Sequence, residues 1–404
     1  MVSLLRCVAS VAFASFPQGS IQRVDRQISS IDTSTLNGKL FVGYQAWFRK
    51  PSEDNGNSHW TTNLPTPEVG HVGVDMIPNV TSYPPECLFD TPFTLSDGRS
   101  AQFYTNDCEG VVDLHFKMMA DHGISGAFVQ RFYDYINEAN GGWVNILNYA
   151  KSAAEKYGRG FVIEYDLNGA ATSSTNVTDV FLGDLAALNS ITSSSAYMRH
   201  NGKPVLEIWG FGIVNEVTVD DGIAIVTALK EAGWYVILGV QQAWHAELAA
   251  NQPGSFGPVY QLADMIQPWT VGAYDINNYG DFHDGRQAIE DANALHDLGI
   301  ESSIVVWPGG SSSNANPNES FDHFPRWNGT FYQKQLDGAV SLKPNFIFGA
   351  MFDEVNEGTA IYPLLRNKEL PTNQRFLGVD DNMNPDAYLS MAGDAASRLA
   401  ASWQ

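Results

Sequence analysis

The sequence predicts an α/β protein built as a single (β/α)8 TIM barrel with a long loop insertion after the first strand. Eight short runs of β-branched and aromatic residues recur along the chain, and segments with helical periodicity alternate with them. These runs are almost continuously apolar, which is typical of parallel strands covered on both faces. No glycine-rich dinucleotide motif follows the first strand, and no phosphate-binding loop motif occurs, so an open doubly wound sheet is disfavoured.

The first half of the chain is expected to supply four strands. The first strand spans 39–48, and an irregular insertion rich in Pro, Gly, Asn and Ser follows it over 49–107. The later strands of this half are expected at 126–132, 161–167 and 204–211. Apolar residues at helical spacing predict helices over 110–122, 143–157, 178–190 and 220–232.

The second half repeats the alternation and completes the predicted barrel. Its strands are expected at 235–244, 264–272, 302–309 and 345–353, and its helices at 282–298, 330–342 and 385–402. The segment 245–263 contains Pro and Gly, so it is expected to hold only a short helix. Because no low-complexity linker divides the chain, residues 38–404 are expected to form one catalytic domain.

Several features near the amino terminus and on the predicted surface indicate export. Residues 1–18 resemble a signal peptide, with an N-terminal arm as the alternative. Removing them leaves Cys87 and Cys108, an even pair suited to one disulfide. Four Asn-x-Ser/Thr sites predict glycosylation at Asn79, Asn176, Asn318 and Asn328. We therefore expect a secreted, extracellular glycoprotein.

Composition excludes several classes of partner and cofactor. Lys plus Arg is 23 and Asp plus Glu is 45, giving a net charge of −22, which argues against nucleic acid or an anionic membrane surface. No apolar run reaches the length of a membrane span. The chain has no His-Glu-x-x-His, EF-hand or cysteine-cluster motif, so neither a metal nor another cofactor is expected.

A barrel places its active groups at the carboxyl ends of the strands and in the loops that follow. Aromatic rings, amides and charged groups are concentrated at these positions, which suits a sugar because rings cover its C–H faces while polar groups bind its hydroxyls. The candidate substrate-binding residues of the strand ends are Tyr44, Trp47, Gln130, Arg131, Asp166, Glu207, Trp209, Trp244, Trp269 and Trp307. His59 and Trp60, in the first insertion, are candidates for the roof of the pocket.

Each of these candidates also has a structural interpretation. Glu207 either binds substrate or forms a salt bridge with Arg131 or Arg199. Asp166 either binds sugar hydroxyls or caps the turn that follows it. The pair His59 and Trp60 is equally consistent with packing.

The strongest candidates for chemistry are Asp353, Glu354 and Glu357, which directly follow the last predicted strand. Glycosidic cleavage needs two carboxyl groups with separate roles, one of which protonates the leaving oxygen. Like charges held close together raise one pKa and so supply that acid. Glu354 and Glu357 suit the catalytic pair, and Asp353 would orient them. The alternatives are a helix-capping acidic loop and a cation site.

Several segments, in the same order, resemble glycoside hydrolases of the family 71/99-like group. They are 43–48 (GYQAWF) with His59-Trp60, 113–117 with 126–132, 199–211, and 351–359 (MFDEVNEGT). The resemblance covers roughly 38–365. It implies a (β/α)8 barrel with acidic catalytic residues near its end, as in the endo-acting α-mannosidases of family 99 and the α-1,3-glucanases of family 71.

Family 99 carries an Asn-Glu-Trp-His-Glu-Gly-like motif, and this chain shares its Glu-x-x-Glu-Gly pattern. The resemblance implies that Glu354 removes a proton from the sugar 2-hydroxyl and that Glu357 is the general acid/base. It also assigns Tyr44 to the pocket. Val355 and Asn356 replace the family's Trp and His, so sugar specificity does not transfer.

Together these observations predict a secreted glycosidase that cleaves O-glycosidic bonds, α-linked ones by the resemblance, in a polysaccharide or glycan. The alternative is a carbohydrate-binding protein that keeps the hydrolase scaffold without turnover. Neither a nucleic acid nor a membrane is expected as a partner.

Overall fold

The computed structural model describes seven stretches of the chain: 30–51, 58–61, 66–136, 142–172, 176–250, 254–273 and 286–404. The predicted signal peptide at 1–18 lies outside these residues. So do the first four residues of the helix expected at 282–298.

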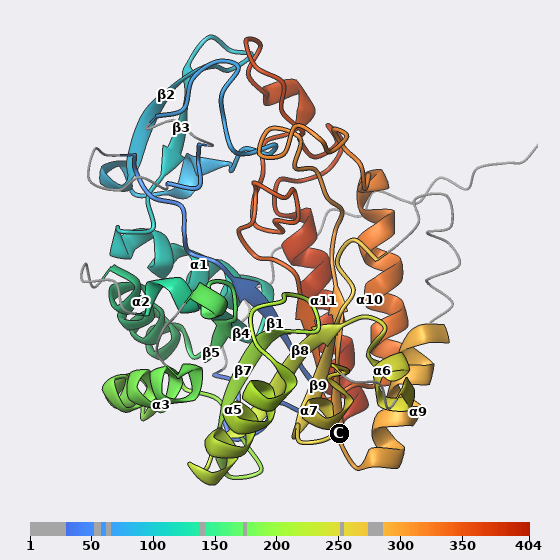
Figure 1. The fold of residues 1–404 in the computed structure, drawn as a ribbon. Coiled ribbons are helices and arrows are strands. Elements are labelled where there is room, and N and C mark those ends of the chain that lie inside the picture. Colours follow the sequence, from blue (N-terminus) through green and yellow to red (C-terminus); the bar gives the residue numbers. More distant parts are fainter. Residues whose placement is uncertain are drawn as a thin grey trace, which may run out of the picture.

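Eight parallel strands close into a ring, which confirms the predicted (β/α)8 barrel (Figure 1). Each strand pairs with the next, and the last strand returns to pair with the first. In order around the ring they are β1 (Lys39–Tyr44), β4 (Gly126–Phe132), β5 (Gly160–Asp166), β7 (Lys203–Phe211), β8 (Tyr235–Gln241), β9 (Met265–Trp269), β10 (Glu301–Val306) and β11 (Phe346–Gly349).

Helices cover the outside of this ring (Figure 1). They are α1 (Glu109–His122), α2 (Gly142–Tyr157), α3 (Val177–Ala187), α4 (Asn189–Thr192), α5 (Val219–Glu231), α6 (Trp244–Ala250), α7 (Gly257–Tyr260), α9 (Arg286–Leu298), α10 (Thr330–Leu342) and α11 (Ala387–Ser402). Local sequence sets several ends: Thr218 and Asp221 form a capping box at the start of α5, and Gly123 ends α1 in a left-handed conformation. None of the helices in the described stretches is long and apolar enough to cross a bilayer.

Several expectations about the elements need correction. The first predicted strand ends at Tyr44 instead of 48, the sixth at Trp269 instead of 272 and the seventh at Val306 instead of 309. The fifth predicted strand ends at Gln241 instead of 244, because Trp244 begins α6, and 245–263 contains both the rest of α6 and α7. The last strand ends at Gly349 instead of 353, because the chain then bends over β1, where the Phe352 amide donates to the Gly43 carbonyl. The insertion is also more regular than expected.

The insertion contains an antiparallel hairpin of β2 (Leu88–Thr94) and β3 (Ser100–Tyr104), which a turn through Gly98 joins. The hairpin rises above the barrel at the carboxyl ends of the strands (Figure 1). A β-bridge between Leu95 and Pro371 connects it to the segment after β11, and the Cys87–Cys108 disulfide connects its base to the start of α1. The predicted disulfide is thus present, with 5.6 Å between the two Cα atoms.

Alternation along the strands separates an outer core from an inner one. On β5, Ile163 and Tyr165 belong to the outer core beneath the helices, whereas Val162 belongs to the inner core. The inner core fills the lower barrel with Phe41, Phe128, Val162, Val205, Ile237, Met265, Phe346 and Phe348. Two residues further along four of the strands, the interior becomes polar at Gln130, Glu164, Glu207 and Gln267, which we call the polar layer.

We expect the double substitution Cys87→Ser/Cys108→Ser to lower the free energy of unfolding by about 2–4 kcal/mol, because the bridge restricts the unfolded chain. Denaturant titration of the two proteins under non-reducing conditions measures this difference. Titration of free thiols in the parent protein is the control. An unchanged unfolding midpoint would show that the hairpin is held by its other contacts alone.

Candidate active site

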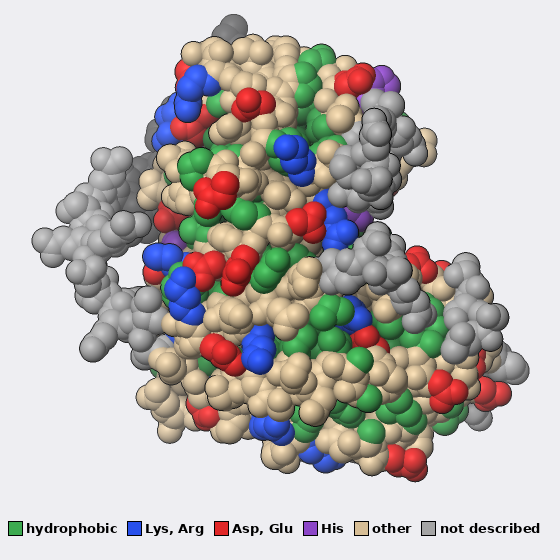
Figure 2. All heavy atoms as spheres, turned by 90° about the vertical axis from the view of Figure 1, so that its left-hand side faces the viewer, with side chains coloured by type: hydrophobic (Ala, Val, Ile, Leu, Met, Phe, Trp, Pro, Cys, Tyr) green, Lys and Arg blue, Asp and Glu red, His purple; other side chains and the backbone are tan. Residues whose placement is uncertain are grey.

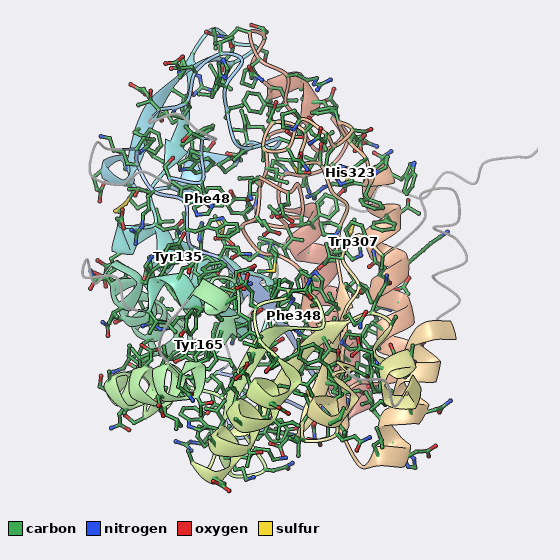
Figure 3. All side chains as sticks on the ribbon, in the orientation of Figure 1. Phe48, Tyr135, Tyr165, Trp307, His323 and Phe348 are labelled. Atoms are coloured by element: carbon green, nitrogen blue, oxygen red, sulfur yellow. A yellow bond between two sulfur atoms is a disulfide. The ribbon has the colours of Figure 1, made fainter. Side chains whose placement is uncertain are left out.

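The site lies at the carboxyl ends of the barrel strands, above the polar layer. Phe132 and Asp166 end β4 and β5 and pair with each other, and Asp166 pairs with Trp209 of β7; all three lie two residues beyond the polar layer. In Figure 3, Phe348, Trp307 and His323 mark successively higher levels, from the inner core to the loops above the strands. From the side, the surface is notched between the hairpin region and the barrel body (Figure 2).

The three predicted acids lie in a turn over 353–359, which we call the acid turn. Asp353 is fully buried and holds the turn against the end of β1, because its two carboxylate oxygens accept the backbone N–H groups of Gln45 and Ala46, each at 2.9 Å. Burial raises the pKa of Asp353 to about 7, although these N–H donors oppose the shift. Asp353 therefore has a positional role and does not face the open part of the site.

Glu354 and Glu357 lie close enough for their charges to interact. Glu354 is buried and accepts a hydrogen bond at each oxygen, from Gln45 Nε2 at 2.9 Å and from Thr359 Oγ1 at 2.6 Å. Burial, followed by the negative charge of Glu357, raises its pKa well above the ordinary value. The Glu357 side chain is exposed to solvent, yet desolvation by the surrounding protein also raises its pKa, which the nearby His323 partly offsets. An accessible carboxyl group with a raised pKa is the arrangement expected in a concave site.

Below the acid turn, Glu164 and Glu207 face each other on adjacent strands of the polar layer. Both are fully buried. Gln267 Nε2 donates to Glu207 at 2.6 Å, and the side chain of Gln130 is the neighbour that favours the ionised form of Glu164. Burial and then the charge of Glu207 raise the pKa of Glu164 well above the ordinary value, and burial raises the pKa of Glu207 to about 8. The pair consequently holds at least one proton at neutral pH.

The acids of the site have no Lys or Arg partner within the described part of the chain. Among the described residues, no Lys or Arg forms an ion pair with Glu164, Asp166, Glu207, Asp353, Glu354 or Glu357. Sites that bind anionic sugars or phosphates use Lys or Arg to pair with the ligand. This site is therefore suited to an uncharged ligand.

Two tryptophans form one wall. Trp209 and Trp269 are half-buried and meet edge to face, with 5.6 Å between ring centroids. Gly239 on the intervening strand leaves room for them, because a Cβ atom there would lie 2.8 Å from the Trp209 ring and 3.1 Å from Glu207. The Trp209 indole N–H has no hydrogen-bond acceptor within the described part of the chain. This N–H group can therefore donate a hydrogen bond to a ligand that reaches it.

On the opposite side of the ring, the rings of His59, Trp47 and Phe132 form a stack. The centroid of Trp47 lies 4.1 Å from that of His59 and 5.3 Å from that of Phe132, and both pairs are nearly parallel. Burial, together with the positive charge of Arg49, lowers the pKa of His59 to about 4, so the stack is uncharged near neutral pH. Because both faces of Trp47 are covered, only its edge can meet a ligand.

The structure places five predicted binding residues away from this site. Trp60 packs inside the insertion on Phe103, Trp244 donates to Asp291 on the helical side, and Trp307 is fully buried between Phe324 and Phe331. The other two point outward from the barrel. Tyr44 contacts His115, and Arg131 pairs with Asp184 of α3. Their expected binding roles therefore become structural ones.

The alternatives for Glu207 and Asp166 are also resolved geometrically. Glu207 points into the barrel and bonds Gln267 rather than an arginine. Asp166 caps the following turn, because its Oδ1 accepts from both the backbone and side-chain nitrogens of Asn168 at 2.8 Å, and burial raises its pKa to about 6. Gln130 belongs to the polar layer beside Glu164.

Three residues of the site were not among the predicted ones. Gln45 and Thr359 orient Glu354, and Glu164 lies in the floor. The signal for Gln45 and Glu164 was their polarity within otherwise apolar strands, whereas Thr359 has no signature beyond its place in the acid turn.

Comparison with known proteins identifies the fold. No family model matches the sequence, and no curated protein matches it. The GH99 endo-α-mannosidase of Bacteroides thetaiotaomicron is 14% identical, with a TM-score of 0.65 over 91% of this chain and 100% of that one. The same enzyme with bis-tris-propane bound gives 16% identity and a TM-score of 0.64 over 91% and 99%.

A structure described as a glycoside hydrolase-like protein is 13% identical, with a TM-score of 0.55 over 92% of this chain and 97% of that one. The chain therefore has a GH99-like barrel fold.

The buried acids predict that the protein loses stability as pH rises. Asp353 titrates near 7 in the folded state and near 3.8 when exposed, so the folded protein keeps a proton that unfolding releases. The unfolding free energy should fall between about pH 4 and 8, by roughly 1.4 kcal/mol per unit of pKa difference. Urea titrations at pH 5 and pH 8 and constant ionic strength test this. Glu207→Gln should reduce the dependence, and equal stability at both pH values would contradict it.

Proposed function

We propose that the protein is a glycosidase in which Glu354 and Glu357 carry out the cleavage of an O-glycosidic bond. The observation that carries the proposal is the pairing of a buried, oriented carboxyl group with an accessible one at the carboxyl ends of the barrel strands. The GH99-like fold supports it, because the compared enzyme is an endo-α-mannosidase. The Glu-x-x-Glu-Gly pattern shared with that family supports the same residues.

The two environments indicate different roles. Glu357 is accessible and has a raised pKa, so it suits the general acid that protonates the leaving oxygen and later deprotonates water. Glu354 is held by two donors, Gln45 and Thr359, which favour its ionised form and direct its remaining lone pairs. It therefore suits the base toward the sugar 2-hydroxyl, as the family resemblance implies.

The substrate that we propose is a neutral, α-linked glycan. Within the described residues, none of the six acids pairs with a Lys or Arg, which disfavours uronic or sulfated polymers. The α linkage rests on the likeness to the endo-α-mannosidase fold and on the sequence resemblance. The edge of Trp47 and the Trp209–Trp269 pair would contact the sugar rings from opposite sides.

We also propose that the protein is secreted and glycosylated. The Cys87–Cys108 bridge suits an oxidising compartment. Three of the four predicted sites, Asn176, Asn318 and Asn328, are exposed, and Asn79 is half-buried. Mass analysis of protein expressed in a eukaryotic host, before and after endoglycosidase treatment, tests occupancy at each site.

The test of the function is turnover of neutral α-mannans and α-glucans, with and without the substitution Glu357→Gln. The parent protein should release oligosaccharides. The variant should lose about 10³-fold or more in kcat on polysaccharides, while glycosyl fluorides, which need little acid assistance, should be less affected. Because Glu357 raises the pKa of Glu354, the variant's acidic limb should also move to lower pH.

Matched measurements separate the competing explanations. A melting temperature equal to that of the parent excludes unfolding as the cause of lost activity. Unchanged polysaccharide turnover by Glu357→Gln would remove that residue from the acid role. Glycan binding by calorimetry without any product, at every pH from 4 to 8, would favour the non-catalytic carbohydrate-binding protein.

A further inference from the structure

We propose that Arg326 is a positioning residue for Glu354 and Glu357, which acts through the backbone of the acid turn. The inference rests on the proposed function. Arg326 precedes α10 and lies in the long loop that follows β10, more than 25 residues from either glutamate in sequence.

The guanidinium group of Arg326 bonds the acid turn directly. One nitrogen, Nη2, donates to the carbonyl of Gly358 at 2.6 Å and to that of Ala360 at 2.7 Å. These carbonyls belong to the residues that immediately follow Glu357 and Thr359, and Thr359 in turn holds Glu354. A shift of this backbone therefore moves the acid, the base and the base's hydrogen-bond donor together.

The charge of Arg326 is buried, and Asp322 acts on it through its charge without forming an ion pair with it. The residue is 6% exposed, and burial lowers its pKa. Among the described residues it forms no ion pair; instead it lies 4.6 Å from the ring of Tyr388 on α11. Carbonyl dipoles, the Tyr388 side chain and the charge of Asp322 compensate this buried cation only in part, because its pKa is still lowered, so the fold gains little stability from it. What it provides is a fixed, planar donor directed at the acid turn.

The rest of the same loop reinforces this geometry. The Ser311 amide donates to the Glu357 carbonyl at 2.8 Å, and a bridge between Gly310 and Phe324 brings the two ends of the loop together beneath the turn. On the other side, the backbone amides of Asp75 and Met76 point at the Val355 carbonyl, at 3.2 and 3.3 Å. The acid turn is thus held from the insertion and from the loop after β10, in which the Arg326 side chain bonds one carbonyl of the turn and the carbonyl directly after it.

The experiment compares Arg326→Met with Arg159→Met. Arg159 is the matched control, because its buried guanidinium also donates to backbone carbonyls, those of Tyr157 and Ile124, but at the amino-terminal end of β5. The Arg326 variant should keep its melting temperature, because methionine fills similar space without a buried charge. Its kcat on a neutral α-glycan should fall on the order of 100-fold with KM within about threefold, as expected for displaced catalytic groups. Arg159→Met should keep the parent kcat.

Hydrogen exchange supplies a readout that is independent of activity. The amides of Thr359 and Ala360 both donate to the Glu354 carbonyl at 3.1 Å, so loosening the turn should raise their exchange rates in Arg326→Met and not in Arg159→Met. The proposal would be overturned if Arg326→Met had the kcat of the parent and unchanged exchange rates at these two amides.

If the methionine variant does not fold, Arg326→Lys replaces it, because a single ammonium cannot reproduce the planar fork. A folded lysine variant with parent kcat and exchange would equally overturn the proposal. If the parent protein turns over no glycan, the proposed function fails, and the exchange rates still decide whether Arg326 holds the turn.

Discussion

The constraint that organises the upper half of this barrel is the burial of carboxyl groups without cations to neutralise them. A carboxylate removed from water is costly unless hydrogen bonds stabilise it or a proton neutralises it. The molecule uses both solutions at different levels. Donors surround Asp353 and Glu354, whereas the Glu164–Glu207 pair retains a proton. The floor therefore carries less negative charge than two ionised carboxylates would, and above it Glu357 is the accessible carboxyl group of the acid turn.

Accessibility rather than acidity alone distinguishes the two catalytic candidates. Both have raised pKa values, but only Glu357 reaches solvent. The surrounding protein desolvates the Glu357 carboxyl group, yet its side chain stays exposed, as expected of a residue in a hollow of the surface. The surrounding loops must hold the acid turn in place, because β11 ends at Gly349, before the acids begin.

The fold was predictable from the sequence because the strands are apolar and regularly spaced, and hydrophobic periodicity is set by local chemistry. The direction of each side chain on those strands, into the barrel or toward the helices, was not predictable. In a strand buried on both sides, such as 126–132, the pattern does not reveal which residues point inward, so Gln130 and Arg131 received the same expectation although only Gln130 faces the interior. Likewise, an indole is equally suited to a core and to a sugar-binding wall, and the position of Trp307 before a loop does not show that the loop covers it.

The acids of the site were predictable because three carboxyl groups directly after an apolar strand need partners. The partners themselves were not predictable. Gln45 and Thr359 act through three-dimensional proximity, and Arg326 belongs to a loop whose length and composition carry no periodic signal. The antiparallel hairpin was missed for a similar reason, since turn-forming residues dominate the insertion and its strands are only half covered.

Asp75 connects the first insertion to two other loops above the barrel. Its carboxylate accepts from Ser311, Ser313 and Asn314, while its backbone contacts the acid turn, so one residue of the first insertion joins two distant loops. In barrels whose loops are independent, evolution and engineers can exchange one loop for another and so recruit a new specificity. Here the contacts of Asp75 couple the insertion, the acid turn and the loop after β10, so these three segments would have to be transplanted together.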